Sequence, residues 1–142
     1  MNLVLDASVI AKWFFEEDGT DLALELLEKH KLEKIKINVP VLLLFEFGNS
    51  VVNKFREDIN TKAEFNQDIT DLLGSEVNFM YPDETILKQT YALAHKYEIT
   101  FYDATYIALA KNLKCDFITA DKKLVKATKT LKFVKLLSKS NN

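Results

Sequence analysis

The sequence predicts a single α/β domain in which a central, mostly parallel sheet of four to five strands carries helices on both faces. Short apolar runs, typical of buried strands, alternate along the chain with longer segments whose apolar residues recur at helical spacing. The chain has 142 residues, of which 48% are apolar and 28% charged, and this is the usual size and balance of one globular domain.

Local patterns define the elements of the first half of the chain. Leu3 to Leu5 form an apolar run that ends in an acid, which is typical of a buried strand, and Asp18-Gly19-Thr20 breaks the helix that follows. Pro40 suits the first turn of a helix. The predicted elements are therefore a strand over 3–5, a helix that ends at Asp18, a helix over 21–31, a strand over 34–39 and a helix over 41–56.

Helix-capping residues organise the second half. Thr61 and Glu64 have the spacing of a capping box, and so do Thr100 and Asp103. The predicted elements are a helix from Thr61 to about Gly74, a strand over 77–81, a helix from Asp83 to about Tyr97, a helix after Thr100, a strand over 116–120, a short basic helix after Asp121 and a strand over 131–134. The polar residues 138–142 are expected to fray.

Composition excludes several classes of site. The net charge of −2 does not favour a nucleic-acid binder, but it does not exclude one whose acids and bases are segregated. Cys115 is the only cysteine, and His30 and His95 lie in helical patterns, so neither a disulfide nor a zinc site is expected. No apolar run is long enough to span a bilayer, and no signal-peptide region precedes Asp6, so we expect a cytoplasmic protein.

Two aspartates follow predicted strands. Asp6 comes directly after the first strand, and Asp121 comes within one residue of the fourth. In open parallel sheets, ligands bind beyond the carboxyl ends of the strands, so both side chains are expected at the edge where a site would form. Each aspartate also begins a helix, and a role as N-cap is a sufficient explanation for either one taken alone. The same holds for Asp103 in its capping box.

Glu46 is more informative, because it lies within an apolar helix. It shares one stripe of that helix with Asn49 and Asn53. A second stripe consists of Val41, Leu44, Phe45, Gly48, Val52 and Phe55. The polar stripe could simply face water. The apolar neighbours of Glu46 favour instead a half-buried carboxylate, which needs a partner, a proton or a metal ion.

The four acids together indicate a metal site. At a separation of about 5 Å and an effective dielectric constant near 20, each pair of carboxylates repels by roughly 3 kcal/mol, so an ionised cluster needs cations. Oxygen ligands favour Mg²⁺ or Mn²⁺ over zinc. Two such ions suit phosphodiester hydrolysis, because one lowers the pKa of a water and the other stabilises the leaving oxygen. The sequence offers no obvious Ser-His or Cys-His pair as an alternative nucleophile.

Four segments, in this order and spacing, resemble the PIN-domain family, and are most similar to its VapC-type toxins. They are Val4-Leu5-Asp6-Ala7-Ser8, Glu46 after Pro40 in an apolar helix, residues 102–110, and Ile118-Thr119-Ala120-Asp121. The resemblance covers nearly the whole chain and implies one PIN-like nuclease domain over 1–142. It implies an endoribonuclease that depends on Mg²⁺ or Mn²⁺, with Asp6, Glu46, Asp103 and Asp121 as its acidic quartet.

The resemblance also assigns supporting residues and partners. Ser8 and Thr119 match small hydroxyl residues that are expected to bond a carboxylate or a metal-bound water, and Asn49 is placed in the same supporting set. An RNA substrate, a homodimer and a small antitoxin that blocks the site are implied as well.

Basic and aromatic residues could complete a substrate surface. Lys12, Lys122 and Lys123 are candidates for positioning phosphates, whereas Lys126 and Lys129 are more simply interpreted as a solvated helix face. Three aromatic residues could stack on bases, although such residues more often belong to the core. These are Phe101, Tyr102 and Tyr106.

Other functions remain open at this point. A housekeeping nuclease of RNA maturation would use the same chemistry. A catalytically silent PIN-like binding module would have no reason to keep four acids. A phosphoacceptor receiver domain needs two adjacent acids after its first strand, whereas Asp6 is followed by Ala7, and the strand predicted over 77–81 carries no acid at its end.

Overall fold

The computed structural model describes residues 1–55 and 61–141 and confirms the predicted fold class. Every strand in this part of the chain is parallel to its neighbours, and the sheet has the order β3-β2-β1-β4-β5. The carboxyl ends of all these strands therefore lie at the same edge of the sheet. The strands are β1 (Asn2–Leu5), β2 (Lys36–Pro40), β3 (Asn78–Met80), β4 (Asp116–Thr119) and β5 (Val134–Leu136).

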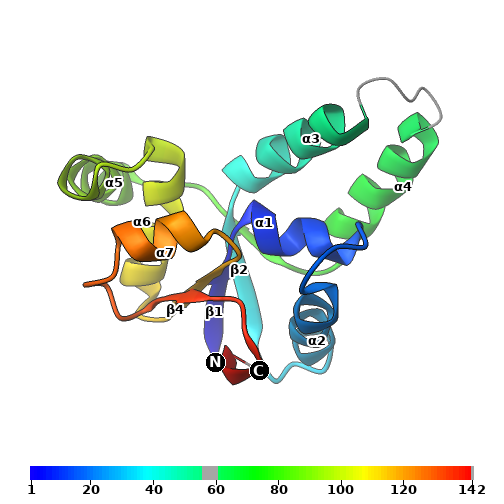
Figure 1. Cartoon of the computed structure of the whole chain (residues 1–142), viewed down its shortest axis with the longest axis horizontal. Helices are drawn as coiled ribbons and strands as arrows, with labels where there is room; N and C mark the ends of the chain where they lie inside the picture. The colour runs from blue at the N-terminus through cyan, green and yellow to red at the C-terminus, as the bar shows by residue number, and fades with distance from the viewer. Residues whose placement is uncertain (56–60, 142) are drawn as a thin grey trace.

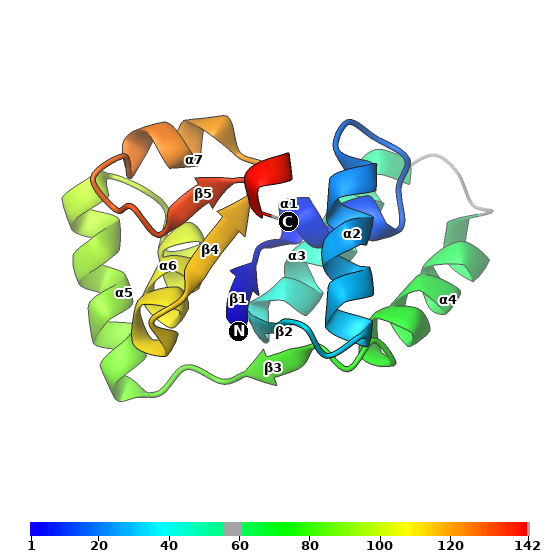
Figure 2. The ribbon, with the colours of Figure 1, turned by 90° about the horizontal axis from the view of Figure 1, so that it is seen from below.

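Helices cover the sheet on both sides, as predicted. They are α1 (Ala7–Ile10), the 3-10 helix η1 (Ala11–Trp13), α2 (Thr20–Lys31), α3 (Leu42–Phe55), α4 (Thr61–Leu73), α5 (Glu84–Tyr97), α6 (Phe101–Leu113), α7 (Lys122–Ala127) and the 3-10 helix η2 (Lys139–Asn141). Helix α6 packs against β1, β2 and β4, and α5 packs against α6. Helix α2 lies on the opposite side of the sheet from α5 and α6 (Figures 1 and 2).

The central strands are apolar because both of their faces are covered. Val4 and Leu5 of β1 are fully buried, as is Phe117 of β4. Residues 104–110 of α6 are buried almost all round, since this helix lies between the sheet and α5. The first strand and the middle of α6 thus lie in the core, and both adjoin predicted site residues.

A row of asparagines crosses three strands and fixes their register. The Asn38 side-chain amide donates to Oδ1 of Asn2 at 3.2 Å, and the Asn78 amide donates to Oδ1 of Asn38 at 2.8 Å. Asn38 is only 2% exposed, and a buried amide without partners is costly. Because a shift in register would break this row, the carboxyl ends of β1, β2 and β3 stay aligned.

Two predicted boundaries are corrected by turns at the strand ends. The strand predicted over 34–39 begins only at Lys36, because the N–H groups of Lys34 and Ile35 donate back to the Lys29 carbonyl. The strand predicted over 131–134 lies instead at Val134–Leu136, because the turn after α7 continues to Val134, whose N–H donates to Leu131.

The ends of other predicted segments also differ in detail. Where the sequence predicts a frayed tail, η2 forms a 3-10 turn, and the Ser138 N–H donates to the Asn141 side chain. The predicted end of the third helix, at Arg56, lies outside the described residues. Among the helices that the structure describes, none has the length and apolar character needed to cross a membrane.

Candidate active site

Asp6 stands where β1 ends and α1 begins, and protein donors hold both of its carboxylate oxygens. Oδ1 accepts from the Ser8 N–H at 3.0 Å, from the Ser8 hydroxyl at 2.5 Å and from the Val9 N–H at 3.3 Å. Oδ2 accepts from the Thr119 hydroxyl at 2.5 Å. The residue is only 6% exposed. Asp6 is therefore an N-cap, as one interpretation of the sequence proposed, and also a buried carboxylate at the carboxyl edge of the sheet.

Two hydroxyl groups connect Asp6 with the end of β4. Besides bonding Asp6, the Ser8 hydroxyl accepts from the Ala120 N–H at 2.9 Å. The Thr119 hydroxyl, which is fully buried, accepts from the Asp121 N–H at 3.0 Å. These bonds fix the backbone of Asp121 relative to Asp6, across a sequence distance of more than one hundred residues.

Asp121 caps α7 and has an exposed side chain. Its Oδ1 accepts from the N–H groups of Lys123 at 2.9 Å and Leu124 at 3.1 Å. Because Oδ1 accepts both bonds, the capping role does not occupy Oδ2. Capping and cation binding are thus compatible at this residue.

Glu46 points inward from α3 rather than into bulk solvent. It is half-buried, and its Oε1 accepts a 2.6 Å hydrogen bond from the hydroxyl of Tyr106 on α6. Tyr106 is 1% exposed and stacks on Phe117 of β4, with ring centroids 5.7 Å apart and planes 10° apart. The core itself therefore determines where this carboxylate lies.

The buried stripe of α3 differs from the apolar stripe seen in the sequence. The residues that enter the core are Leu43, Phe47 and Val51. Phe45 and Val52, which belong to the other stripe, are 75% and 54% exposed. Helical spacing alone does not tell which of two apolar stripes faces the sheet, since that depends on the angle at which α3 leaves β2.

The charge of Asp103 acts on both Asp6 and Glu46. The pKa of Asp6 is raised to about 6, mainly by burial and in small part by the charge of Asp103, while hydrogen bonds from Ser8, Thr119 and Val9 act in the opposite direction. The pKa of Glu46 is likewise raised by burial, lowered in part by the Tyr106 hydrogen bond, and raised by Asp103.

Asp103 itself occupies the first turn of α6 and is half-buried. Its backbone N–H donates to the Thr100 hydroxyl at 3.0 Å, so the predicted capping position is present. Burial raises the pKa of Asp103, hydrogen bonding by Thr100 lowers it, and the charge of Asp121 raises it. Asp103 is thus the electrostatic neighbour that Asp6, Glu46 and Asp121 share.

The chemistry of this group suits a hard divalent cation. All the donors are carboxylate oxygens, the ligands that Mg²⁺ and Mn²⁺ prefer. In the described part of the chain, no lysine or arginine pairs with any of the four acids. The described residues nonetheless contain no group of three or more His, Cys, Asp or Glu side chains arranged to hold a metal ion. The acids therefore interact electrostatically through Asp103 but do not form a complete coordination sphere in this structure.

A polar hollow of about 430 Å³ opens beside Glu46, between the α1–η1 segment and α3. Ser8 and Glu46 line it, and so do the predicted residues Asn49 and Lys12. The exposed Asn49 makes no hydrogen bond to any of the four acids in the described chain. Lys122 and Lys123 are exposed in the first turn of α7, outside this hollow.

The role of Tyr106 was missed by the sequence interpretation, which treated three aromatic residues alike. The core interpretation is right for Tyr106 and wrong for Phe101 and Tyr102, which are 42% and 60% exposed. One signal was available: Tyr106 lies one turn after Asp103, on the face that a helix presents with that acid. Its contact with Glu46 joins residues sixty positions apart and could not be read from spacing.

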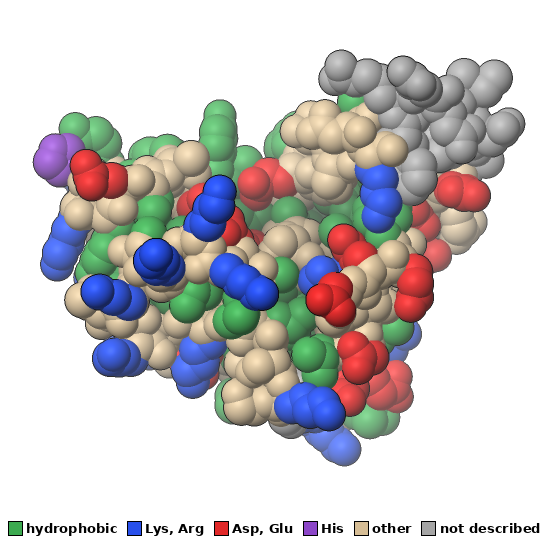
Figure 3. All heavy atoms as spheres, in the orientation of Figure 1, with side chains coloured by type: hydrophobic (Ala, Val, Ile, Leu, Met, Phe, Trp, Pro, Cys, Tyr) green, Lys and Arg blue, Asp and Glu red, His purple; other side chains and the backbone are tan. Residues whose placement is uncertain are grey.

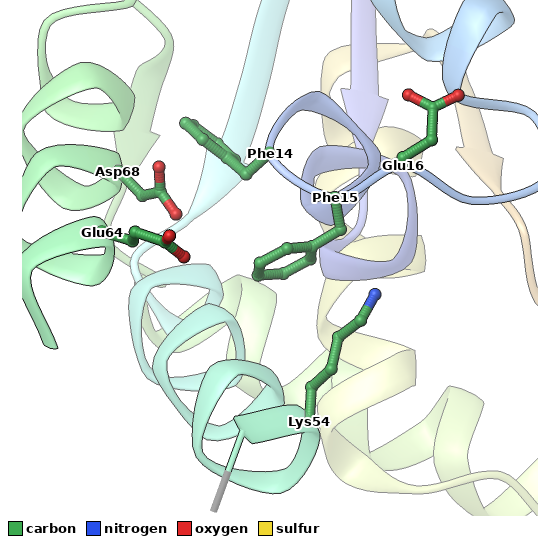
Figure 4. Close-up of a pocket in the computed structure, with 6 residues that line it drawn as sticks. All are labelled: Phe14, Phe15, Glu16, Lys54, Glu64 and Asp68. Carbon is green, nitrogen blue, oxygen red and sulfur yellow. The ribbon is translucent and has the colours of Figure 1, made fainter. Parts of the chain in front are cut away.

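A second hollow, of about 360 Å³, lies beside the residues that follow η1, and none of the four acids lines it (Figure 4). Phe14 and Phe15 face Glu64 and Asp68 of α4 across it. The Lys54 ammonium lies 4.6 Å from the centre of the Phe15 ring, at a distance typical of a cation–π contact.

Comparison with known proteins agrees with the fold. The chain is 27% identical over 125 residues to ribonuclease VapC3 of Pyrobaculum aerophilum, covering 87% of this chain and 92% of that protein. The crystal structure of PAE2754 from the same organism superposes with a TM-score of 0.68 at 22% identity, covering 96% of this chain and 92% of the other. VapBC2 of Rickettsia felis, solved with a promoter DNA fragment, gives 0.65 at 19%, covering 96% and 97%. The PIN-domain model matches residues 3–129, and the chain therefore belongs to the PIN-domain family.

Proposed function

We propose that this protein is a metal-dependent endoribonuclease and the toxin of a toxin–antitoxin pair. One observation carries the proposal: the charge of Asp103 adds to the effect of burial in raising the pKa of both Asp6 and Glu46, and Asp103 is itself affected by the charge of Asp121. These electrostatic contacts support our inference that four carboxylates from separate parts of the chain act together, and none of them has an ion-pair partner among the described residues. The name of the relative, ribonuclease VapC3, supports RNA as the substrate.

Mg²⁺ or Mn²⁺ is the cofactor that this cluster suits, with Asp6, Glu46, Asp103 and Asp121 as ligands. When bound, such cations make a water nucleophilic near neutral pH and neutralise charge on the leaving oxygen. They would also neutralise the charge of Asp103, which adds to the effect of burial in raising the pKa values of Asp6 and Glu46.

The surrounding residues have separate tasks. Ser8 and Thr119 hold Asp6 in a single orientation through its two oxygens. Tyr106 does the same for Glu46 through Oε1, which leaves Oε2 available. Such outer contacts keep a carboxylate oriented before any cation arrives.

Polar residues near the cluster would place the RNA. Lys12 and Asn49 line the hollow that contains Glu46, so they can contact a nucleotide beside the cleaved bond. Lys122 and Lys123 directly follow Asp121 and can contact a phosphate there.

The partners follow from the relatives. Because a toxin–antitoxin complex from Klebsiella pneumoniae contains a chain of the same fold, we assign an antitoxin partner to this chain. A homodimer is supported by apolar side chains left exposed on two helices, Phe45 on α3 and Tyr91 on α5, which are 75% and 66% exposed. We place the protein in the cytoplasm, where its RNA substrate is found.

The alternative functions make different predictions. A silent PIN-like module needs no cluster of repelling acids, so the intact group favours an enzyme. A housekeeping nuclease of RNA maturation would cut RNA equally well but would not arrest growth when expressed alone.

Incubation of total RNA with the purified protein tests the activity. We expect cleavage with Mn²⁺ or Mg²⁺, none with chelator, and none by Asp103→Asn under either condition. An Asp103→Asn protein that cut RNA at the wild-type rate would remove this cluster from the mechanism. Growth arrest on expression, relieved by the protein encoded next to it, would separate the toxin from the housekeeping nuclease.

A further inference from the structure

Charge is distributed unevenly along this chain. Residues 101–142 contain nine lysines and three acids, whereas the first hundred residues contain ten basic and eighteen acidic residues. The net charge of −2 therefore conceals an acidic part and a basic part. The space-filling view shows lysine side chains gathered over the region of α7 and β5, and acidic side chains over the region of α2 (Figure 3).

Five lysines follow Asp121 within eleven positions, and we call them the lysine surface. All five are exposed, and none forms an ion pair in the part of the chain that the structure describes. The next lysine, Lys135, is different because it pairs with Asp116 at 2.6 Å. The lysine surface consists of Lys122, Lys123, Lys126, Lys129 and Lys132.

In the described part of the chain, these lysines contribute no ion pair to the fold. Lys122 and Lys123 lie in the first turn of α7, where the helix dipole disfavours positive charge, and that turn contains no acid. Five positive charges without an ion pair, within two turns and one loop, also repel one another. A helix face that only contacts water would be more stable with alternating acidic and basic residues. The run of lysines is therefore better explained by an anion that binds from outside.

The lysine surface begins at the acid cluster and leads away from it. Asp121 caps α7, and its backbone is tied through Thr119 to Asp6. Lys126 lies one helical turn further on, and Lys129 and Lys132 lie in the segment between α7 and β5. A polyanion bound along these lysines would therefore have one end at the cluster.

We propose that the lysine surface is the docking site for the phosphate backbone of the RNA, on the side of the cleaved bond next to α7. This inference rests on the proposed ribonuclease function. Contacts of this kind orient the strand without reading its sequence, and they make binding dependent on salt. An acidic protein partner is the competing occupant, and RNA is favoured because the surface is continuous with the cluster at which a phosphodiester would be cut.

Binding of a fluorescent single-stranded RNA, followed by anisotropy in chelator, separates docking from cleavage. The variant is Lys126→Gln/Lys129→Gln, which lies beyond the proposed catalytic residues. The matched control is Lys31→Gln/Lys34→Gln, which removes the same charge at exposed positions near the amino edge of the sheet. Both proteins, and the wild type, are titrated with KCl.

We expect the Lys126/Lys129 variant to bind RNA more weakly, and its plot of log K against log [salt] to be shallower by about 0.7 for each phosphate that it no longer neutralises. The control should keep the wild-type slope. In cleavage assays with Mn²⁺ the Lys126/Lys129 variant should show a higher KM and an unchanged kcat.

Equal slopes of log K against log [salt] for the two double variants would overturn the proposal that the lysine surface binds RNA. These residues would then contact a protein or have no partner. Failure of the ribonuclease proposal would look different, since the wild type would then leave RNA uncut in Mn²⁺ whatever the binding slopes were.

Discussion

The hydroxyl of Tyr106 donates a 2.6 Å hydrogen bond to Oε1 of Glu46 and thereby joins α6 to α3 at the acid cluster. Tyr106 is buried and stacked on Phe117, so its hydroxyl has little freedom to move. Burial and the charge of Glu46 raise the pKa of Tyr106 far above its usual value. The phenol therefore remains protonated and acts as a fixed donor that sets the orientation of Glu46.

Removal of this donor should weaken metal binding more than folding. Tyr106→Phe keeps the ring and its stack on Phe117 but leaves Glu46 free to rotate. Removal of such an outer hydrogen bond typically lowers metal affinity by about 10- to 100-fold. Mn²⁺ affinity by calorimetry is the readout, and the thermal midpoint in chelator reports on the fold. Tyr97→Phe, which removes an exposed hydroxyl bonded to Thr130, is the control. Equal Mn²⁺ affinities for the two variants would show that Tyr106 is only structural.

Neutralising Asp103 should stabilise the metal-free protein while abolishing RNA cleavage. Asp103 acts electrostatically on Asp6 and Glu46 and is affected by Asp121, so Asp103→Asn relieves several repulsions at once. Each relieved repulsion is expected to be on the order of 1 kcal/mol at an effective dielectric constant near 20. Thermal unfolding in chelator measures the gain. Asp116→Asn, which only removes the exposed pair with Lys135, should leave the midpoint nearly unchanged. A lower midpoint for Asp103→Asn would mean that the acid has a structural role.

Much of the fold could be predicted because its signals are local. Buried parallel strands read as short apolar runs, and capping residues mark the starts of several of the helices that follow them. Asp6 and Asp121 were identifiable as site candidates for this reason: strand ends place them at one edge of the sheet. The apolar sequence after Pro40 likewise located the helix that carries Glu46, although Pro40 itself ends β2 and does not lie in the first turn of that helix.

The features of the fold and site that the sequence did not predict depend on tertiary packing. Which stripe of α3 faces the core follows from the angle between helix and sheet, so the exposure of Phe45 could not be read from helical periodicity. The contact between Tyr106 and Glu46 depends on two helices that no local pattern pairs. The start of β5 depended on a turn after α7 that holds the chain until Val134.

The stability of the metal-free protein should fall as pH rises through the pKa of Asp6. In the folded state that pKa is about 6, above the usual 3.8, so the native protein binds a proton that the unfolded chain has already released. This stabilisation is complete below about pH 4, is lost as pH approaches and passes 6, and amounts to at most roughly 3 kcal/mol. Urea unfolding in chelator between these pH values measures it.

Asp6→Asn supplies the control for the pH series, because an amide does not titrate there. Its free energy of unfolding should vary less between pH 4 and pH 7 than that of the wild type. Should both proteins show the same pH dependence, other groups would be responsible for it, and the desolvation of Asp6 would be offset by its hydrogen bonds to Ser8 and Thr119.

Added Mn²⁺ should raise the thermal midpoint of the wild type, because the cation binds the folded cluster and not the dispersed carboxylates of the unfolded chain. At a free concentration about one hundred times Kd, the stabilisation is about 2.7 kcal/mol. Asp103→Asn, which lacks the acid shared by the other three, should show little of this shift at the same concentration. Differential scanning fluorimetry with matched Ca²⁺-free buffers gives both values. Two results together would contradict the metal site: a wild-type midpoint that does not move at millimolar Mn²⁺, and an Asp103→Asn protein that is more stable than the wild type in chelator. They would show that the carboxylates repel one another but that no cation binds between them.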